Sequence, residues 1–348
     1  MIYVFRQLTK NYRIVFNHGR REGRVKMTAD TIVVVPVHNE GKFLDQTIRS
    51  LICQTYKSFN ILVSCNSCTD ESLEIAKKYS AQDARIRVLE TSGNLPSFGH
   101  WRWIMSQIED KNRYKFGLSI GGHDIVSPRY VELLVRELTS NSGLSLCYPE
   151  EAYAVDGLDR IKFRYPPMPQ TYSKSDFFQS IPLILSIRYN ILAFGLWRSA
   201  YFFDENYRNC YAADHIRIGD ISRNGAVKSV HGASILVRDT SRGLETYARK
   251  HFGTQDLDLR RGIAEQFSWV DLLSRSLLPT PVPVLNDALR LSALTMYFAR
   301  YLEQFGGNAD KLNLLFREPE ISAALSGQAR LMKLLEKWIE SNCTADKS

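Results

Sequence analysis

The stretch TIVVVPVHNEGKFLDQTIRSLICQTY, residues 31–56, joins a continuous apolar run to an amphipathic segment. The apolar run, 31–37, is rich in β-branched residues, which is typical of a strand buried on both faces. The segment after the polar turn HNEG repeats apolar residues at helical spacing, namely Leu44, Ile48, Leu51 and Ile52. The stretch therefore predicts a strand followed by a helix, the repeating unit of an α/β fold.

The alternation of strand and helix continues through the first half of the chain. Apolar runs predict further strands at 59–65, 85–90, 114–120 and 144–149, with helices between them at 70–80 and 101–108. Another helix is expected with Ser127 as its N-cap and Pro128 at its first position. Repeated units of this kind imply a mostly parallel sheet flanked by helices, and such sheets bind ligands at the carboxyl ends of their strands.

The second half of the sequence is less regular. Residues 150–255 mix short strand-like runs with loops, and the proline-spaced stretch LLPTPVPV at 277–284 leads into helical patterns. We therefore predict a basic N-terminal arm at 1–28, an α/β domain at 29–255 and a helical C-terminal region at 256–348. The domain divides near residue 150 into halves 29–150 and 151–255.

The composition is that of an ordinary globular protein. Of 348 residues, 44% are apolar and 24% are charged, and no uninterrupted apolar stretch is long enough to span a bilayer. The N-terminus lacks the apolar core and cleavage pattern of a signal peptide. These features predict a cytoplasmic protein.

The net charge of +8 is concentrated at the N-terminus, where residues 1–28 hold seven basic side chains against one acid. We interpret this arm first as a solvated tail. Contact with an anionic membrane surface is the alternative, and Met27 is a second candidate start because the first strand begins at Thr31. A nucleic-acid partner is not supported, since the basic excess is mostly one tail without a recognised motif.

The cysteines do not form a disulfide framework, because the six of them are spread over residues 53–343. Cys65 and Cys68 make a CxxC motif where a strand passes into a helix, which is also the position of thioredoxin-like redox sites. No second CxxC completes a zinc site, and no Trp precedes the first Cys. We interpret the motif as two small residues at a tight turn.

Four segments, taken in order, resemble the family 2 glycosyltransferases of the GT-A fold. VVVPVHNEGKFLDQTIRSLICQTY (33–56) is similar to the family's opening strand, Pro-x-x-Asn-Glu turn and helix, and ILVSCNSCTDESLEIAKKY (61–79) to its second unit. YKFGLSIGGHDIVSPRYVELLV (114–135) falls at the Asp-x-Asp motif, and YAADHIRIGDISRNGAVKSV (211–230) resembles the acceptor-side Glu-Asp segment. The resemblance implies a Rossmann-like GT-A sheet that binds the nucleotide in half 29–150 and the acceptor in half 151–255.

A nucleotide pocket at the first strand ends is part of what this resemblance implies. Its expected members are Pro36, Val37, Asn39, Glu40, Asn66, Asp70 and Asp124. Cys65 stands where an Asp is common in the family, which leaves the identity of the base open. Structural alternatives remain for several members, since Asn39 suits a turn and carboxylates such as Glu40 and Asp70 suit helix starts.

The sequence GGHD at 121–124 departs from the Asp-x-Asp pattern, because Gly121 replaces the first acid and His123 the second. In the family these acids hold Mg²⁺ or Mn²⁺ against the diphosphate, so His123 and Asp124 are the expected metal and diphosphate residues. Mn²⁺ tolerates imidazole better than Mg²⁺ does. Charge compensation by arginine, a direct phosphate contact from His123 and a structural Gly-Gly turn are the alternatives.

Inverting sugar transfer also needs a carboxylate that takes the proton of the acceptor hydroxyl. Asp214 stands where the family's base lies, although Ala213 replaces the preceding Glu, and Asp220 is a weaker rival. Further on, His231 and Arg242 are the expected diphosphate contacts in the segment SVHGASILVRDTSRG, because Arg suits bidentate phosphate binding.

The sequence therefore predicts a non-processive inverting glycosyltransferase with Asp214 as its general base. The expected donor is a nucleotide-diphosphate sugar and the acceptor a glycan or lipid-linked glycan, as in polysaccharide or lipopolysaccharide assembly at the inner face of the membrane. The processive signature Gln-x-x-Arg-Trp is absent from the sequence. A degenerate GT-A module that binds nucleotide or glycan without turnover is the alternative, and a nucleotidyltransferase lacks support because no Gly-rich loop with a following Lys lies near the first strand.

Overall fold

The computed structural model describes residues 29–157, 160–165, 171–172, 191–204, 217–218, 221, 225–238, 333 and 337. Its strands and helices lie in the first of two compact units into which the chain divides. Within the second unit (174–188, 208–220 and 241–348), residues 217, 218, 333 and 337 are described. The predicted basic arm and most of the predicted helical region at 256–348 therefore lie outside the described residues.

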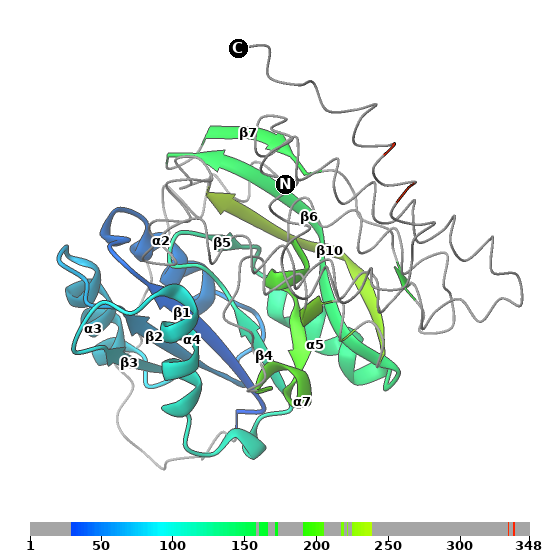
Figure 1. Cartoon of the computed structure of the whole chain (residues 1–348), viewed down its shortest axis with the longest axis horizontal. Helices are drawn as coiled ribbons and strands as arrows, with labels where there is room; N and C mark the ends of the chain where they lie inside the picture. Colours follow the sequence, from blue (N-terminus) through cyan, green and yellow to red (C-terminus); the bar gives the residue numbers. More distant parts are fainter. Residues whose placement is uncertain are drawn as a thin grey trace, which may run out of the picture. The chain divides into compact units, whose positions relative to one another are not determined.

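The first half of the described unit alternates strands and helices as the sequence predicts. Its elements are β1 (Thr31–Val37), α2 (Gly41–Ile52), β2 (Phe59–Cys65), α3 (Ser72–Gln82), β3 (Ile86–Glu90), α4 (Ser97–Ser106), a 3-10 turn (Lys111–Arg113) and β4 (Phe116–Ser119). The strands are parallel in the order β3-β2-β1-β4 (Figure 1). The side chains of β1 are almost all buried, which agrees with a strand covered on both faces.

The second half of the unit extends the same sheet with mixed pairing. Its elements are β5 (Ile125–Val126), α5 (Tyr130–Ser140), β6 (Leu144–Asp156), β7 (Arg160–Arg164), β8 (Thr171–Tyr172), a 3-10 turn (Ile191–Phe194), β9 (Leu196–Arg198), α7 (Ser199–Phe202) and β10 (Ala226–Arg238). The sheet continues β4-β9-β6-β10-β5, in which β9 is antiparallel to both of its neighbours and β10 is parallel to β6. The predicted α/β fold is confirmed, with antiparallel strands added beyond β4.

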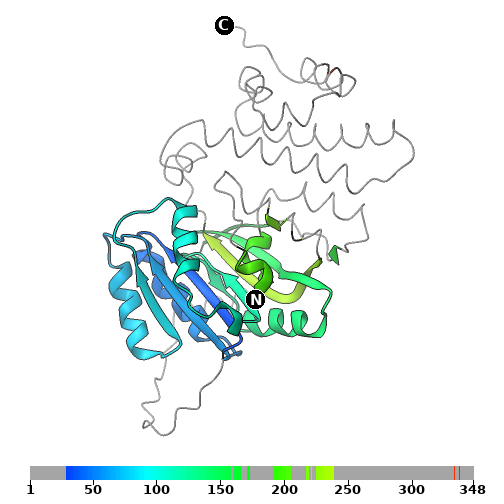
Figure 2. The ribbon, with the colours of Figure 1, turned by 60° about the horizontal axis from the view of Figure 1, so that its bottom comes forward.

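Helix α5 packs on β6 and β10, as the view in Figure 2 shows. It buries one face that includes Tyr130, Leu134 and Leu138, because these residues recur at helical spacing. Among the described residues, no helix has the length and apolar character that crossing a membrane requires.

The predicted start of α5 is wrong. The helix begins at Tyr130, and its N-cap residue Arg129 makes no capping hydrogen bond through its side chain. The Ser127 hydroxyl instead accepts the backbone N–H of Ser234 in β10 at 3.2 Å. Ser127 is therefore not an N-cap, because a strand distant in sequence occupies the hydroxyl group that would have capped the helix.

Candidate functional site

Three neighbouring parallel strands, β2, β1 and β4, end at one edge of the sheet. β1 lies between the other two and pairs in parallel with both. The turns HNEG, CNSC and GGHD, which follow or end these strands, therefore meet at that edge, where α/β sheets bind their ligands. This arrangement agrees with the sequence-based expectation for the position of the site.

The end of β1 presents mainly its backbone at this edge. Pairing with β4 stops at Val34, so Pro36, which has no N–H, removes no hydrogen bond from that ladder. Val37 is buried, and its carbonyl oxygen accepts the backbone N–H of Asn66 at 2.8 Å. The carbonyl thereby joins the turns that follow β1 and β2.

Asn39 and Glu40 form the turn that leads from β1 into α2. Asn39 has a left-handed backbone with φ of 57°, a conformation that Asn adopts more readily than most residues. Its Oδ1 accepts the Thr69 N–H at 2.8 Å, and the Glu40 N–H donates to Ser72 Oγ at 2.8 Å. The exposed Asn39 and the half-buried Glu40 are thus held in place by the segment before α3.

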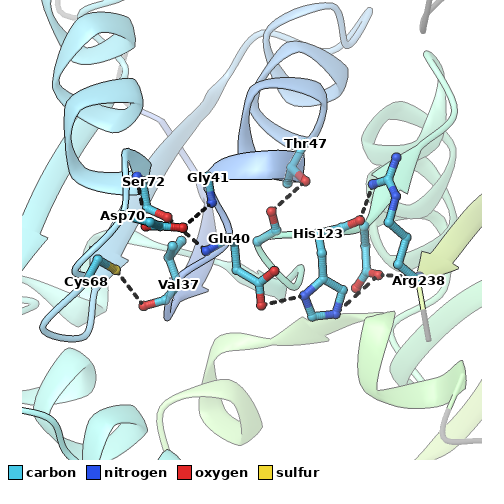
Figure 3. A network of polar contacts seen from close by, with 11 residues as sticks. Val37, Glu40, Gly41, Thr47, Cys68, Asp70, Ser72, His123 and Arg238 are labelled. Atoms are coloured by element: carbon cyan, nitrogen blue, oxygen red, sulfur yellow. Dashed lines mark hydrogen bonds and ion pairs between the residues drawn. The ribbon is translucent and has the colours of Figure 1, made fainter. Parts of the chain in front are cut away.

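Asp70 fastens the same turn from the other side, as Figure 3 shows. Its Oδ2 accepts the Gly41 N–H at 2.8 Å and its Oδ1 accepts the Ser72 N–H at 3.0 Å. Partial burial acts to raise the pKa of Asp70, but hydrogen bonds from Ser72 and Gly41 outweigh it and lower that pKa. The carboxylate therefore holds the first residues of two helices.

Asn66 is 4% exposed, and its amide makes four hydrogen bonds within the protein. Its Nδ2 donates to Leu95 O at 2.7 Å and to Asn94 Oδ1 at 3.2 Å. Its Oδ1 accepts the Leu95 N–H at 2.9 Å and the Thr91 hydroxyl at 3.2 Å. Two donors and two lone pairs are all that an amide side chain offers, so Asn66 positions segment 91–95 instead of presenting its amide to a base.

Glu40, His123 and Arg238, which Figure 3 labels, form a second set of contacts together with Asp124, and we call these four residues the ion-paired group. His123 Nδ1 lies 3.0 Å from Glu40 Oε1, and its Nε2 lies 3.8 Å from Asp124 Oδ1. The backbone N–H of Arg238 donates to Asp124 Oδ1 at 3.1 Å. The Arg238 guanidinium donates to the carbonyls of His123 and Gly157 and to Gln46 Oε1. The group therefore ties the ends of β1, β4 and β10 together.

The two glycines of GGHD allow this close approach. A Cβ atom at Gly122 would lie 3.1 Å from Val37 Cγ2 and 3.3 Å from the carbonyl oxygen of Pro36. A Cβ atom at Gly121 would lie 2.7 Å from Asp124 Oδ2, which is closer than real Cβ contacts. A side chain at either position would push the turn away from β1 or displace the buried carboxylate.

Burial and charge act against each other in the ion-paired group. Burial raises the pKa of Asp124, which is 1% exposed, although the charges of His123 and Arg238 oppose that shift. Burial disfavours the charged imidazole of His123, yet the Asp124 charge and the Glu40 hydrogen bond outweigh it and raise the pKa of His123. Burial also lowers the pKa of Arg238 to about 10. His123 and Asp124 therefore both hold protons more tightly than they do in water.

Comparisons with known proteins agree with this geometry. A family model described as Glycosyl transferase family 2 matches residues 32–183, which span β1, β2 and β4. Residues 32–183 form a glycosyltransferase family 2 domain.

Curated relatives match this chain over short segments. Glycosyltransferase GlyG of Streptococcus pneumoniae is 40% identical over 57 residues, which is 16% of this chain and 19% of GlyG. Glycosyltransferase GlyA of the same organism is 43% identical over 58 residues, covering 17% of this chain and 8% of GlyA. The matched segments thus span less than a fifth of these relatives.

Solved structures share the fold of the domain at low sequence identity. The crystal structure of S. aureus TarS 1-349 matches with a TM-score of 0.57 at 14% identity, covering 90% of this chain and 89% of that chain. The same protein in complex with UDP-GlcNAc gives a TM-score of 0.56. These matches show that the glycosyltransferase domain has the GT-A fold.

Members of the glycosyltransferase family often hold a divalent metal at the Asp-x-Asp position, but the described residues of this chain do not fit such a site. Gly121 supplies no carboxylate, and Asp124 is buried with one oxygen bound to the Arg238 N–H. His123 directs Nδ1 at Glu40. No cluster of three His, Cys, Asp or Glu side chains suited to a metal occurs among the described residues.

Of the remaining predicted site residues, His231 is described by the structure and is not in the ion-paired group. His231 is exposed and contacts Glu150 Oε2 through Nδ1 at 2.6 Å. It precedes Arg238 by seven positions along β10, roughly 20 Å at the rise of a strand, so the structure does not bring His231 to the ion-paired group. Asp214 and Arg242 lie outside the described residues.

Arg238 belongs to the ion-paired group, although it is not among the site residues predicted from the sequence. It lies in the segment SVHGASILVRDTSRG, in which the predicted diphosphate contacts are His231 and Arg242. The signal that identifies Arg238 is its position, because it is the last residue of β10 after the apolar run SILV. The rule that functional groups lie at strand ends applies to this arginine as well.

Proposed function

We propose that this protein is an inverting glycosyltransferase that moves a sugar from a nucleotide-diphosphate sugar to a glycan or lipid-linked glycan. One observation carries the proposal: the family 2 match covers the three parallel strands whose ends assemble Glu40, His123 and Asp124. The fold shared with TarS, which was crystallised with UDP-GlcNAc and with UDP, supports a nucleotide-sugar donor.

The nucleotide binds, in this proposal, over the turn that follows β1. Asn39 is exposed and Pro36 and Glu40 are half-buried, so these residues and the backbone at Val37 form the surface offered to the base and ribose. Asn66 and Asp70 act as positioning residues, because Asn66 is hydrogen bonded to segment 91–95 and Asp70 to the N–H groups of Gly41 and Ser72. Asp124 positions His123 and Arg238 from its buried place.

Asp214 is the general base of the proposed reaction. It takes the proton of the acceptor hydroxyl as the oxygen attacks the anomeric carbon, and the nucleoside diphosphate departs from the opposite face with inversion. Arg242 and His231 remain weaker candidates for diphosphate contacts. A Mn²⁺ or Mg²⁺ ion also remains a prediction, and the proposed reaction includes no step through a metal, since the described residues do not fit one.

The setting of the reaction is proposed from the sequence. The basic arm at 1–28 supports a protein that works at the inner, cytoplasmic face of a membrane, where anionic lipid attracts lysine and arginine. Such a surface would supply lipid-linked glycan acceptors. Vesicle co-sedimentation with and without anionic lipid tests this part of the proposal without affecting the donor assignment.

Thermal unfolding in the presence of nucleotides tests the donor assignment. UDP, GDP, CDP and dTDP are each added with Mn²⁺, Mg²⁺ or EDTA, because a ligand of the folded state raises the melting temperature by mass action. We expect one nucleotide to raise the melting temperature by several degrees, with UDP tried first. If no nucleotide changes the melting temperature under any metal condition, the donor assignment is wrong.

The general base is tested by Asp214→Asn, with Asp220→Asn as the matched control. Transfer by Asp214→Asn should fall by about 10²–10⁴-fold, the contribution typical of a general base, while nucleotide stabilisation persists. Asp220→Asn should keep most of its transfer activity. Loss of transfer in Asp220→Asn alone would reassign the base to Asp220.

The second candidate function is a GT-A module that binds nucleotide or glycan without turnover. It is favoured by the replacement of an acid with Gly121 and by the burial of Asp124, which leave few free carboxylates at the edge. Nucleotide stabilisation without transfer to any tested acceptor, and without hydrolysis of the donor sugar, would support this module over the enzyme.

A further inference from the structure

Cys65 and Cys68 lie at the carboxyl end of β2 and take no part in the proposed transfer reaction. Cys65 is the last residue of β2 and is fully buried, whereas Cys68 is half-buried in the turn that follows. The two residues therefore combine one inaccessible thiol with one thiol that small reagents can reach.

The backbone between the two cysteines turns sharply, which brings the thiols together. Ser67 has a left-handed φ of 48°. The Val37 carbonyl accepts the Asn66 N–H at 2.8 Å. It also accepts the Cys68 thiol at 3.7 Å (Figure 3), so it draws residues 66 and 68 toward one point. The Cys65 and Cys68 thiols lie close enough to each other that each shifts the pKa of the other. The sequence-based interpretation of a tight turn is correct, and the turn also makes a thiol pair.

The surroundings of the pair favour a thiolate at Cys68. A hydrogen bond from Cys65 lowers the pKa of Cys68 to about 6, against the opposing effect of burial, and the Asn39 N–H and His38 act in the same direction. The same contact, together with burial, raises the pKa of Cys65. The Cys68 thiol therefore loses its proton more readily than the Cys65 thiol does.

The other described cysteines have the opposite character. Burial raises the pKa of Cys53, and it raises that of the fully buried Cys147 well above its usual range. Cys147 donates its thiol to Leu134 O at 3.2 Å, as a structural cysteine does. Cys53 is half-buried like Cys68, so it provides a matched comparison with similar access but a higher pKa.

We propose that Cys65 and Cys68 form a dithiol modification site, in which Cys68 attacks a low-molecular-weight disulfide and Cys65 resolves the adduct. The Cys68 thiolate attacks one sulfur of the small disulfide RSSR, forms a mixed disulfide and releases RS⁻. The Cys65 sulfur then attacks Cys68 Sγ, its proton passes to the departing RS⁻, and a Cys65–Cys68 disulfide forms. The protein is oxidised by two electrons, and RSSR is reduced to two thiols.

The cysteine pair lies beside Asn39 and Asn66, two residues of the candidate site, so oxidation of the pair would change their surroundings. Asn66, between the two cysteines, holds segment 91–95 through its amide, and Asn39 contributes its N–H to Cys68. A disulfide would abolish the thiolate charge on the Cys68 sulfur that accepts the Asn39 N–H, and it would restrain the backbone on both sides of Asn66. This inference does not depend on the proposed function, because the reactivity of the thiols is measured without any nucleotide or acceptor.

The pH dependence of alkylation tests the assignment in the unmodified protein. Full-length protein is treated with limiting iodoacetamide between pH 5 and pH 9, and alkylation at each cysteine is followed by peptide mass spectrometry. The rate at Cys68 should level off by about pH 7, whereas the rate at Cys53 should still rise up to pH 9. A Cys68 rate that climbs about tenfold per pH unit through pH 8 would overturn the proposal.

Oxidised glutathione tests the order of attack. Wild-type protein and the control variant Cys53→Ser should both form the Cys65–Cys68 disulfide, seen as the loss of two hydrogens from the peptide that contains both residues. Cys65→Ser should stop at a glutathione adduct on Cys68, and Cys68→Ser should carry no adduct on Cys65. An adduct on Cys65 in Cys68→Ser, or none on Cys68 in Cys65→Ser, would refute the roles assigned. Should a variant fail to fold, the alkylation profile of the unmodified protein decides the question.

Discussion

Two strand ends on either side of β1 hold their polar residues in different ways. At the end of β2, the Asn66 amide is satisfied by four hydrogen bonds between uncharged groups. At the end of β4, His123 and Asp124 are held by charges, with Glu40 and Arg238 as partners. The β2 end is therefore a neutral connection, whereas the β4 end is an ionic one.

The two histidines near these ends show the same difference. His100 of α4 is 4% exposed and contacts Ser64 Oγ through Nε2 at 2.8 Å, beside the end of β2. Burial, helped by His38, lowers the pKa of His100 to about 4. His123 has a raised pKa, because carboxylates outweigh its burial. The β2 end thus favours a neutral imidazole and the β4 end a charged one.

The largest effect is expected from removing Arg238. Arg238→Leu removes the guanidinium whose charge, together with that of His123, compensates the buried Asp124 carboxylate, and it should lower the free energy of unfolding by about 3–5 kcal/mol. Urea unfolding at pH 7 measures the loss. The double variant Arg238→Leu/Asp124→Asn should recover part of it, because the uncompensated charge is gone.

The matched control for this prediction is Arg129→Leu. Arg129 forms an exposed pair with Glu132 at 2.7 Å, so its removal should change the stability little. Equal losses from the two arginine variants, or no recovery in the double variant, would contradict an ionic connection at the end of β4.

The next largest effect is a pH dependence of stability, to which His100 and His123 contribute with opposite signs. The folded pKa of His100 is about 4 and the unfolded value is about 6.5, so the unfolded state binds more protons between these values. Stability should therefore fall by about 3 kcal/mol as the pH decreases from about 6.5 to about 4. His123 has the opposite sign: its contribution is complete below about pH 6.5 and is lost as the pH rises through its raised folded pKa.

Urea unfolding from pH 4 to pH 9 checks both signs with His100→Gln and His123→Gln. The His100 variant should lose much of the acid-side dependence, and the His123 variant much of the alkaline-side dependence. Each variant serves as the control for the other. The contrast fails if both substitutions flatten the same side of the profile.

Asn66→Ala probes the neutral connection directly. The substitution leaves the Leu95 N–H and carbonyl without their side-chain partners, which should cost about 2 kcal/mol of stability. Asn94→Ala is the control, because Asn94 is exposed and makes one of the four bonds. A loss for Asn66→Ala no larger than that for Asn94→Ala would show that the amide does not hold segment 91–95.

The first half of the fold was predictable because its signals are local. The apolar run of β1 and the helical spacing of α2 each lie within one short stretch of sequence. The edge at which the site lies follows from the parallel order, since the carboxyl ends of β2, β1 and β4 must meet.

The remaining features depend on partners that are distant in sequence. Ser127 reads as a helix cap until β10 supplies the Ser234 N–H. Asn66 reads as a ligand for a base until segment 91–95 occupies its amide. β9 is short and joins the sheet between β4 and β6, a pairing that no periodicity in residues 196–198 indicates. Local patterns thus predict elements, whereas the use of each polar group is settled by tertiary contacts.

The smallest effect is expected at His231, where a charged pair lies outside the ion-paired group. His231 is 95% exposed at its side chain, and its contact with Glu150 is open to water and salt. His231→Ala should therefore change stability by less than about 0.5 kcal/mol and leave nucleotide stabilisation unaltered. Thermal unfolding with and without nucleotide measures both. If nucleotide stabilisation disappears in His231→Ala, the diphosphate contact inferred from the sequence is correct, and the charged contacts that matter extend along β10 well beyond the end of β4.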